Sequence, residues 1–161
     1  MLMLALLMAA ATPQPWVEMS AGPLLLHESG RSGVGSGPLV RLDVGYPVGD
    51  RFAAEVWLSG AMESAPSGPL GDRALVGGGA GGRALLHRFG DEGKLALWAH
   101  AGAGWGLPAA GDGQPGPTGF AGALVAFQPF IQRFSLALEA DAVAYRSAYG
   151  IVLLPSLRCS F

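Results

Sequence analysis

Alternation of apolar and polar residues is the feature of this sequence that most limits its possible folds. In the run LVRLDVGY, Val40, Leu42 and Val44 fall on one side of an extended chain, and Arg41 and Asp43 fall on the other. Successive side chains of a β-strand point to opposite faces, so this period of two predicts a strand with one apolar and one polar face. Helical periodicity never persists for three turns in the 161 residues, and the sequence therefore favours an all-β fold.

The alternating runs predict eight strands separated by turn residues. They span residues 15–26, 37–47, 50–60, 73–88, 93–105, 117–128, 132–145 and 149–161. Glycine accounts for 26 residues, a content that opposes long helices but suits turns and tightly curved sheets.

Short and long connections alternate between these strands. PVGD, FGDEG and PFIQ are short, whereas HESGRSGVGSG, GAMESAPSGPLGD and GLPAAGDGQPGPTG are long; the last connection, RSAYG, is short as well. Successive connections of an up-and-down barrel lie at opposite ends, so this alternation predicts a barrel whose two ends face different environments.

Aromatic residues gather at the strand ends on the side of the short connections, and Trp98 alone lies clearly in the middle of a strand. The core of a soluble barrel collects aromatic residues at mid-height, whereas the interfaces of a bilayer attract them to strand ends. The last residue, Phe161, lies at the same level as this predicted girdle. The girdle consists of Trp16, Tyr46, Phe52, Phe89, Phe127, Phe130 and Phe134.

Alternation alone leaves two orientations of the faces open. In a soluble periplasmic barrel of the lipocalin kind, the aliphatic rows line a cavity for a small apolar ligand and the charges face water. In a membrane barrel the same rows face lipid, and strands of about ten residues are long enough to cross it. The aromatic girdle and the alternating connections favour the membrane, and we predict an all-β, eight-stranded antiparallel up-and-down transmembrane β-barrel. The charged residues that then gather inside are Glu18, Arg41, Asp43, Glu55, Arg83, His100, Glu139, Asp141 and Arg158.

The C-terminal stretch SLRCSF carries a resemblance to known proteins. Leu157, Cys159 and Phe161 fall on one face of the last strand, and the sequence ends on the aromatic residue. Together with the eight strands and the girdle, this stretch resembles the small outer-membrane barrels of the OmpA/OmpX-like kind. The resemblance implies a C-terminal signal read by the barrel assembly machinery, outer-membrane lipid as the surroundings, a monomer, and a location in the outer membrane of a Gram-negative bacterium.

Two prolines depart from the pattern of such barrels. Pro23 and Pro155 fall inside the first and last strands, which must pair to close the barrel, and proline donates no hydrogen bond to a ladder. If Phe161 lies beside Trp16, the two prolines are nearly side by side. Such a seam is either bulged but closed, or a weak point that admits lipid sideways from the bilayer.

The first eleven residues, MLMLALLMAAA, form an apolar segment that ends in an A-x-A cleavage pattern. We predict a cleaved signal peptide over 1–11 and a barrel domain over 12–161, although no Lys or Arg precedes Arg31. A first core strand and a short membrane anchor are the alternatives.

Composition excludes several kinds of chemistry. The net charge of −2 gives nucleic-acid binding no electrostatic support, and the single cysteine, Cys159, forms no internal disulfide. No zinc, redox or phosphate-loop motif occurs, and we predict no cofactor, no metal and no catalytic residue. The nearest approach to a catalytic set is His27 and Ser29 on the first long connection, with Ser64, Ser67 and Asp72 on the second.

These observations predict a non-enzymatic outer-membrane barrel with a charged, plugged interior and a structural or surface-interaction role. Two alternatives stay open. One is a lipid A-modifying outer-membrane enzyme that uses His27 with a serine of the connections. The other is the soluble periplasmic barrel that carries a small apolar ligand.

Overall fold

The structure, a computed structural model, describes residues 14–28, 33–64, 73–90, 94–110, 114–129, 133–146 and 148–161. No helix in these ranges is long and apolar enough to cross a membrane. The chain forms eight antiparallel strands, each of which overlaps a predicted one. They are β1 (Trp16–Glu28), β2 (Gly35–Val48), β3 (Phe52–Glu63), β4 (Arg73–Phe89), β5 (Leu95–Ala110), β6 (Gly116–Phe127), β7 (Phe134–Tyr145) and β8 (Ala148–Ser160).

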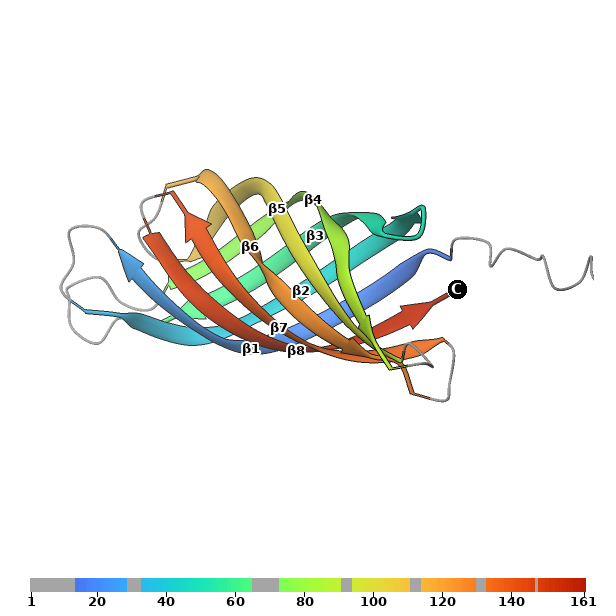
Figure 1. Ribbon diagram of the computed structural model, residues 1–161. Coiled ribbons are helices and arrows are strands. Elements are labelled where there is room, and N and C mark those ends of the chain that lie inside the picture. The colour runs from blue at the N-terminus through green and yellow to red at the C-terminus, as the bar shows by residue number, and fades with distance from the viewer. Residues whose placement is uncertain are drawn as a thin grey trace, which may run out of the picture.

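The eight strands close into an up-and-down barrel (Figure 1). Each strand pairs with its neighbour in sequence, and β8 pairs with β1 from Trp16–Ser160 to Glu28–Ala148. The predicted fold class is therefore confirmed. We call one end of the barrel the turn end. It carries the connections 49–51, 90–94 and 128–133, the start of β1 and the end of β8. The opposite end, with the connections 29–34, 64–72, 111–115 and 146–147, is the loop end.

The predicted contrast between long and short connections is much weaker in the structure. Strands at the loop end continue into residues that the sequence suggested as loop: β2 begins at Gly35 and β5 runs to Ala110. The start of β4 pairs with both of its neighbours at the loop end. Arg73 pairs with Glu63 of β3, and Ala74 pairs with Ala110 of β5. Glycine and proline obscure the alternation in these stretches, so pairing with neighbouring strands, and not local sequence, decides where the strands end.

Apolar side chains cover the outside of the barrel. Along β2, Val40, Leu42 and Val44 are exposed while Arg41 and Asp43 are buried. A water-soluble barrel requires the opposite arrangement, because exposed apolar surface on this scale is unstable in water. The structure therefore does not support the soluble, lipocalin-like alternative.

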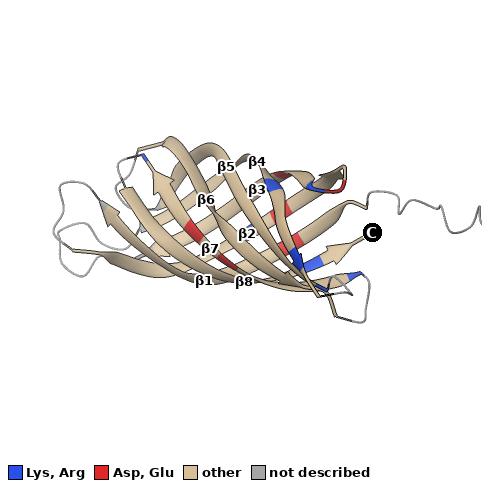
Figure 2. Cartoon of the chain, in the orientation of Figure 1, with Lys and Arg blue, Asp and Glu red and all other residues tan. Residues whose placement is uncertain are grey.

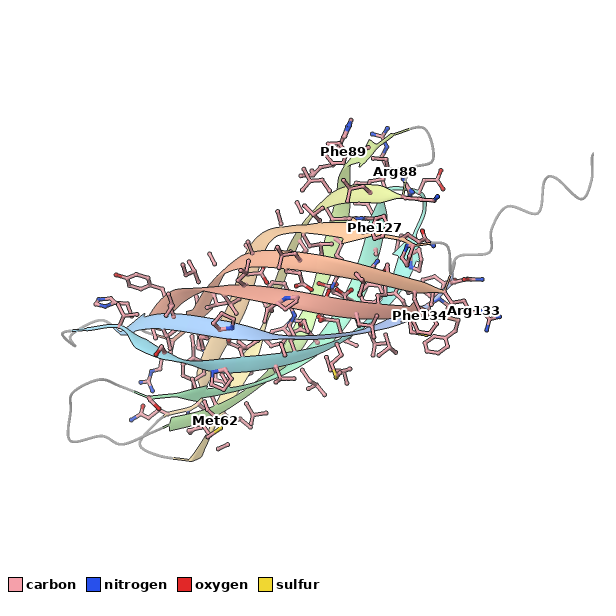
Figure 3. The ribbon with its side chains drawn as sticks, turned by 90° about the horizontal axis from the view of Figure 1, so that it is seen from below. Met62, Arg88, Phe89, Phe127, Arg133 and Phe134 are labelled. Atoms are coloured by element: carbon pink, nitrogen blue, oxygen red, sulfur yellow. The ribbon has the colours of Figure 1, made fainter. Side chains whose placement is uncertain are left out.

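The outer aromatic residues of the predicted girdle lie at the turn end. Tyr46, Phe52, Phe89, Phe127 and Phe134 are all exposed on the outer surface. Figure 3 shows three of them, Phe89, Phe127 and Phe134, at this end, with Arg88 and Arg133 beside them and Met62 at the opposite end of the molecule. Phe130, the other predicted member apart from Trp16, lies outside the described residues.

Trp16 is a correction to the predicted girdle. Its side chain is only 4% exposed and lies inside the barrel. It packs against Gly45, where a Cβ atom would overlap the indole ring. Position at a strand end suggested an interfacial residue, but Trp16 is two residues from the buried Glu18 and so points to the same, inner face.

Glycine lines the inner wall of β4 and β5. Three glycine pairs face each other across these strands: Gly77–Gly106, Gly79–Gly104 and Gly81–Gly102. A Cβ at Gly79 would overlap the carbonyl oxygen of Ala103, and one at Gly102 would lie 2.8 Å from Trp57 Nε1. The run GGGAGG therefore allows close strand approach and makes room for aromatic side chains inside the barrel.

The β1–β8 seam is closed, but its ladder is interrupted at the prolines. Pairing runs from Trp16 to Ser20 on β1 and resumes at Leu24, which faces Val152. In this register Pro23 faces Leu153 and not Pro155, so the two prolines are offset by two residues. Gly22 lies so close to the Leu153 carbonyl that a Cβ would overlap its oxygen.

Both prolines remove hydrogen bonds from this same seam. The Phe161 N–H donates to the Pro15 carbonyl at 3.0 Å, so odd-numbered residues of β1 and β8 direct their backbone groups toward each other. Pro23 and Pro155 are odd-numbered and have no N–H. Two ladder bonds are therefore missing at neighbouring positions.

Replacing both prolines by valine, as Pro23→Val with Pro155→Val, is expected to restore these two bonds. At about 0.5–1.5 kcal/mol for each bond, the free energy of unfolding should rise by about 1–3 kcal/mol. Urea unfolding in lipid vesicles measures it, with Pro115→Val outside the strands as control. An unchanged stability would contradict this account.

Entry of lipid through the interrupted part of this seam remains a prediction. The same pair of substitutions tests it, because a complete β1–β8 ladder should abolish any lipid-dependent activity.

Candidate functional site

All nine charged residues predicted for the interior point into the lumen. Eight are buried, and Arg158 is half-buried. They come from seven strands, with β6 contributing Phe120 and Leu124 instead. Figure 2 shows most of the charged positions within the strands between the middle of the barrel and the end that carries the C-terminus. The residues are Glu18, Arg41, Asp43, Glu55, Arg83, His100, Glu139, Asp141 and Arg158.

Arg41 binds three carboxylates at once. Its Nε donates to Asp43 Oδ2 at 3.1 Å, its Nη1 donates to Asp141 Oδ2 at 2.9 Å, and its Nη2 donates to Glu139 Oε2. His100 Nε2 lies 2.6 Å from Asp141 Oδ1. An ionised carboxylate only accepts hydrogen bonds, so this histidine nitrogen is the donor. The planar guanidinium thus ties β2 to β7, about a hundred residues away in the chain.

A second set of pairs surrounds Glu18 on β1. Arg83 donates from Nη1 to Glu18 Oε2 at 2.7 Å and from Nε to Glu55 Oε2 at 2.5 Å. Arg158 donates from Nε to Glu18 Oε2 at 2.8 Å, and Ser156 donates to Glu18 Oε1 at 2.6 Å. These bonds join β1 with β3, β4 and β8, and two of them cross the seam.

Aromatic rings stack on the three guanidinium groups. Arg41 lies 4.4 Å from the centre of the Phe120 ring, and Arg83 and Arg158 lie 4.5 Å and 4.3 Å from that of Trp16. A cation over a ring face is stabilised by the ring quadrupole, more strongly where water is excluded. Trp16 and Phe120 are therefore parts of the network that the sequence did not assign to it.

Among the described side chains of the lumen, five carboxylates face three arginines and His100. With every carboxylate ionised, the formal charge of the set is −2 with neutral histidine and −1 with protonated histidine. Several buried polar atoms have no partner, among them Asp43 Oδ1, Glu55 Oε1 and Glu139 Oε1. A network of this kind fills and crosslinks the turn-end half of the lumen. Its described side chains form no continuous row of unpaired groups that could bind an ion along the barrel.

His100, Glu139 and Asp141 are the described residues with a spacing compatible with a metal ion. Each offers a ligand atom, and these atoms lie within 4.8 Å of one another. Arg41 donates to both carboxylates, so a cation already occupies the place where a metal would bind. We therefore assign no metal here.

The residues considered for catalysis do not form a catalytic set in the described part of the chain. His27 Nδ1 lies 3.1 Å from the Gly33 carbonyl oxygen, and its ring packs against Tyr149. Ser64 pairs through its backbone with Ser36. Ser29, Ser67 and Asp72 lie outside the described residues.

The predicted assembly signal lies on the outer face of β8. Leu157 is exposed, Cys159 is half-buried, and Phe161, just after the strand, is exposed. The three side chains alternate with Ser156 and Arg158, which point inward. Their recognition by an assembly machinery stays a prediction.

The loop-end half of the lumen holds a cavity that the sequence did not suggest. The space between its walls amounts to about 630 Å³, including the part that is open to solvent. Its floor is formed by Arg41, Trp57 and Phe120, at the upper limit of the charged network. Its walls are mostly apolar and include Leu24, Leu26, Leu39, Ala61, Val143 and Val152.

Comparison with known proteins gives matches in structure only. No family model and no curated protein matches the sequence. Neisserial surface protein A superposes with a TM-score of 0.70 at 14% identity, over 91% of this chain and 97% of that one. Ail, the attachment invasion locus protein of Yersinia pestis, gives 0.62 at 13% identity, over 92% and 99%. The N-terminal barrel domain of Pseudomonas aeruginosa OprF gives 0.54 at 15% identity, over 93% and 100%.

The chain has the fold of the small outer-membrane β-barrels. The predicted resemblance is confirmed at this level, since nearly the whole of each compared chain is matched. One of the similar structures is of the outer membrane protein Ail in a phospholipid bilayer nanodisc, with a TM-score of 0.54. The expected location, the outer membrane of a Gram-negative bacterium, agrees with this fold and with the apolar outer surface.

Proposed function

We propose that the protein is a non-enzymatic outer-membrane barrel with a closed lumen, which acts as a structural element of the membrane and through contacts at its loop end. The observation that carries the proposal is the charged network. It joins seven strands across the lumen, and a protein that uses its lumen as a pore would keep that space open.

Similar proteins support a role at the cell surface. One is named a surface protein and another an attachment invasion locus protein. In this chain the strands of the loop end are extended well past the charged network. Such strand ends hold the connections between them away from the bilayer, where a partner can reach them.

Gel mobility is the first test of the membrane barrel. Protein refolded in detergent should migrate differently in SDS before and after boiling, because a closed barrel resists SDS until it is heated. Absence of a shift, together with solubility in the absence of detergent, would contradict the membrane assignment.

Planar-bilayer recording tests the closed lumen. The wild-type barrel is expected to give no steady conductance above that of the bare bilayer, because Arg41, Arg83 and their carboxylates fill the cross-section. The double substitution Arg41→Ala with Arg83→Ala removes two crosslinks and serves as the comparison, provided that it still shows the heat-dependent shift. A stable conductance of the wild type would overturn the proposal.

A lipid A modification assay separates this proposal from the enzyme alternative. We expect the lipid A profile of cells that produce the wild type to equal that of cells that produce His27→Ala. A modification that appears with the wild type and is lost with His27→Ala would assign catalysis to the loop end.

A further inference from the structure

Arginine is followed directly by phenylalanine at three places in this sequence, and all three lie at the turn end. One such pair is found at each of the turn-end connections 49–51, 90–94 and 128–133. The three pairs are therefore spread around the rim of the barrel, on β3, β4 and β7. We call them the Arg–Phe pairs; they are Arg51 with Phe52, Arg88 with Phe89, and Arg133 with Phe134.

Both members of each Arg–Phe pair are exposed. The rings of Phe52, Phe89 and Phe134 lie on the apolar outer surface, and the three arginines are exposed beside them. Figure 3 shows two of the pairs, with Arg88 next to Phe89 and Arg133 next to Phe134. Aromatic rings at the ends of membrane strands mark the boundary between acyl chains and head groups. The neighbouring guanidinium groups therefore lie at the level of the lipid phosphates.

The arginines of the pairs have no carboxylate partner within the described part of the chain. All ion pairs between described residues belong to the lumen network. Arg51 and Arg133 lie in turns just before their strands, and Arg88 is the last residue but one of β4. No strand continues past them, so the barrel wall does not confine their side chains. A long arginine side chain at such a place extends to the head groups while its stem covers apolar surface.

The charge of the chain differs between the two ends of the barrel. Outside the lumen, the turn end has four basic and three acidic side chains, whereas the loop end has three basic and four acidic ones. At the loop end, Arg31 and Arg73 have no aromatic neighbour in the sequence. Arg146 follows Tyr145, but this side chain is half-buried and its hydroxyl donates to the Gln114 carbonyl oxygen. An arginine beside a lipid-facing ring is thus a feature of the turn end.

The head group that best fits this setting is a phosphate whose charge nothing else compensates. A guanidinium group binds phosphate through parallel N–H donors in a planar fork. Phosphatidylcholine carries its own ammonium beside the phosphate, whereas phosphatidylglycerol carries no cation. A lipid also brings acyl chains to the ring of the pair, which a soluble phosphate or an acidic protein does not.

We propose that the turn end of the barrel binds anionic phospholipids at the Arg–Phe pairs. The phosphate lies on the arginine, and an acyl chain packs against the adjacent phenylalanine. Vesicles of phosphatidylcholine alone offer these arginines no such partner. The inference rests on the membrane location of the barrel and goes beyond its proposed structural role, and it does not depend on a closed lumen.

Competition between two lipids with identical acyl chains tests the proposal. The purified barrel in detergent micelles receives equal amounts of dipalmitoylphosphatidylglycerol and dipalmitoylphosphatidylcholine, and native mass spectrometry counts the bound copies of each. A basic residue near an anionic lipid surface contributes about five-fold in affinity. The wild type should therefore retain phosphatidylglycerol over phosphatidylcholine by about five-fold. Equal retention of the two lipids would overturn the proposal and leave the closed lumen untouched, which planar-bilayer recording tests separately.

Two matched triple variants locate the binding. The turn-end variant combines Arg51→Gln, Arg88→Gln and Arg133→Gln, and it should retain the two lipids about equally. The loop-end variant combines Arg31→Gln, Arg73→Gln and Arg146→Gln. It loses the same number of charges and should keep the preference of the wild type. A preference that survives in the turn-end variant, or that the loop-end variant loses to the same extent, would overturn the assignment to the Arg–Phe pairs.

Folding and the free anion are controlled in the same experiment. Each variant is compared only if it shows the heat-dependent gel shift; if the turn-end variant does not, Arg133→Gln alone should bind fewer copies of phosphatidylglycerol than the wild type. Inorganic phosphate equimolar to the lipid should displace none of it, because the free anion has no acyl chain to pack on the rings. Complete displacement would show a site for the free anion and overturn the lipid as its occupant.

Discussion

Arg41→Met should lower the free energy of unfolding of this barrel by about 3–5 kcal/mol. The substitution leaves a side chain of similar length but removes the positive charge to which the carboxylates of Asp43, Glu139 and Asp141 are bound. Breaking a buried ion pair from one side leaves uncompensated buried charge, which accounts for a loss of this size. Urea unfolding of the barrel in lipid vesicles, followed by tryptophan fluorescence, measures the change.

Two further variants show that the effect comes from the buried charge. Arg133→Met removes an exposed arginine at the turn end and should change the stability by less than about 0.5 kcal/mol. Adding Glu139→Gln to Arg41→Met removes one of the carboxylates that no longer has a cation beside it. This second substitution should recover part of the lost free energy of unfolding. If Arg41→Met is as stable as the wild type, the network does not crosslink the lumen, and the argument for a closed barrel fails with it.

The alternation of residues was sufficient to predict the faces of the strands. Arg41 and Asp43 lie inside while Val40 and Leu42 lie outside, because a strand has no other way to place neighbouring side chains. The same rule places Trp57 inside, since it shares a face with Glu55. Position along the strand was a poorer guide. Trp16 lies at a strand end and was assigned to the interface, although its parity with Glu18 places it in the lumen.

Contacts between strands far apart in sequence were beyond this reasoning. Arg41 meets Glu139 and Asp141 because of the curvature and register of the closed barrel, neither of which is encoded in a single run of residues. The register of the seam shows the same limit. The prediction placed Pro23 nearly beside Pro155, and a shift of one residue in the ladder sets Pro23 against Leu153. The cavity was missed for a related reason, because empty space depends on how side chains from eight strands fill the lumen.

Gly79→Val is expected to prevent the barrel from closing, so that little or no heat-modifiable band forms on refolding. A Cβ at this position would overlap the carbonyl oxygen of Ala103, and this backbone atom cannot move without separating β4 from β5. Overpacking of a well-packed site costs about 1–3 kcal/mol where neighbouring side chains can adjust, and here the neighbour is backbone. The matched control is Ala80→Val, one residue along the same strand, whose side chain is exposed on the outer face and should leave the band unchanged. Normal folding of Gly79→Val would show that the glycine wall tolerates side chains, and the close approach of β4 and β5 would then not explain the run GGGAGG.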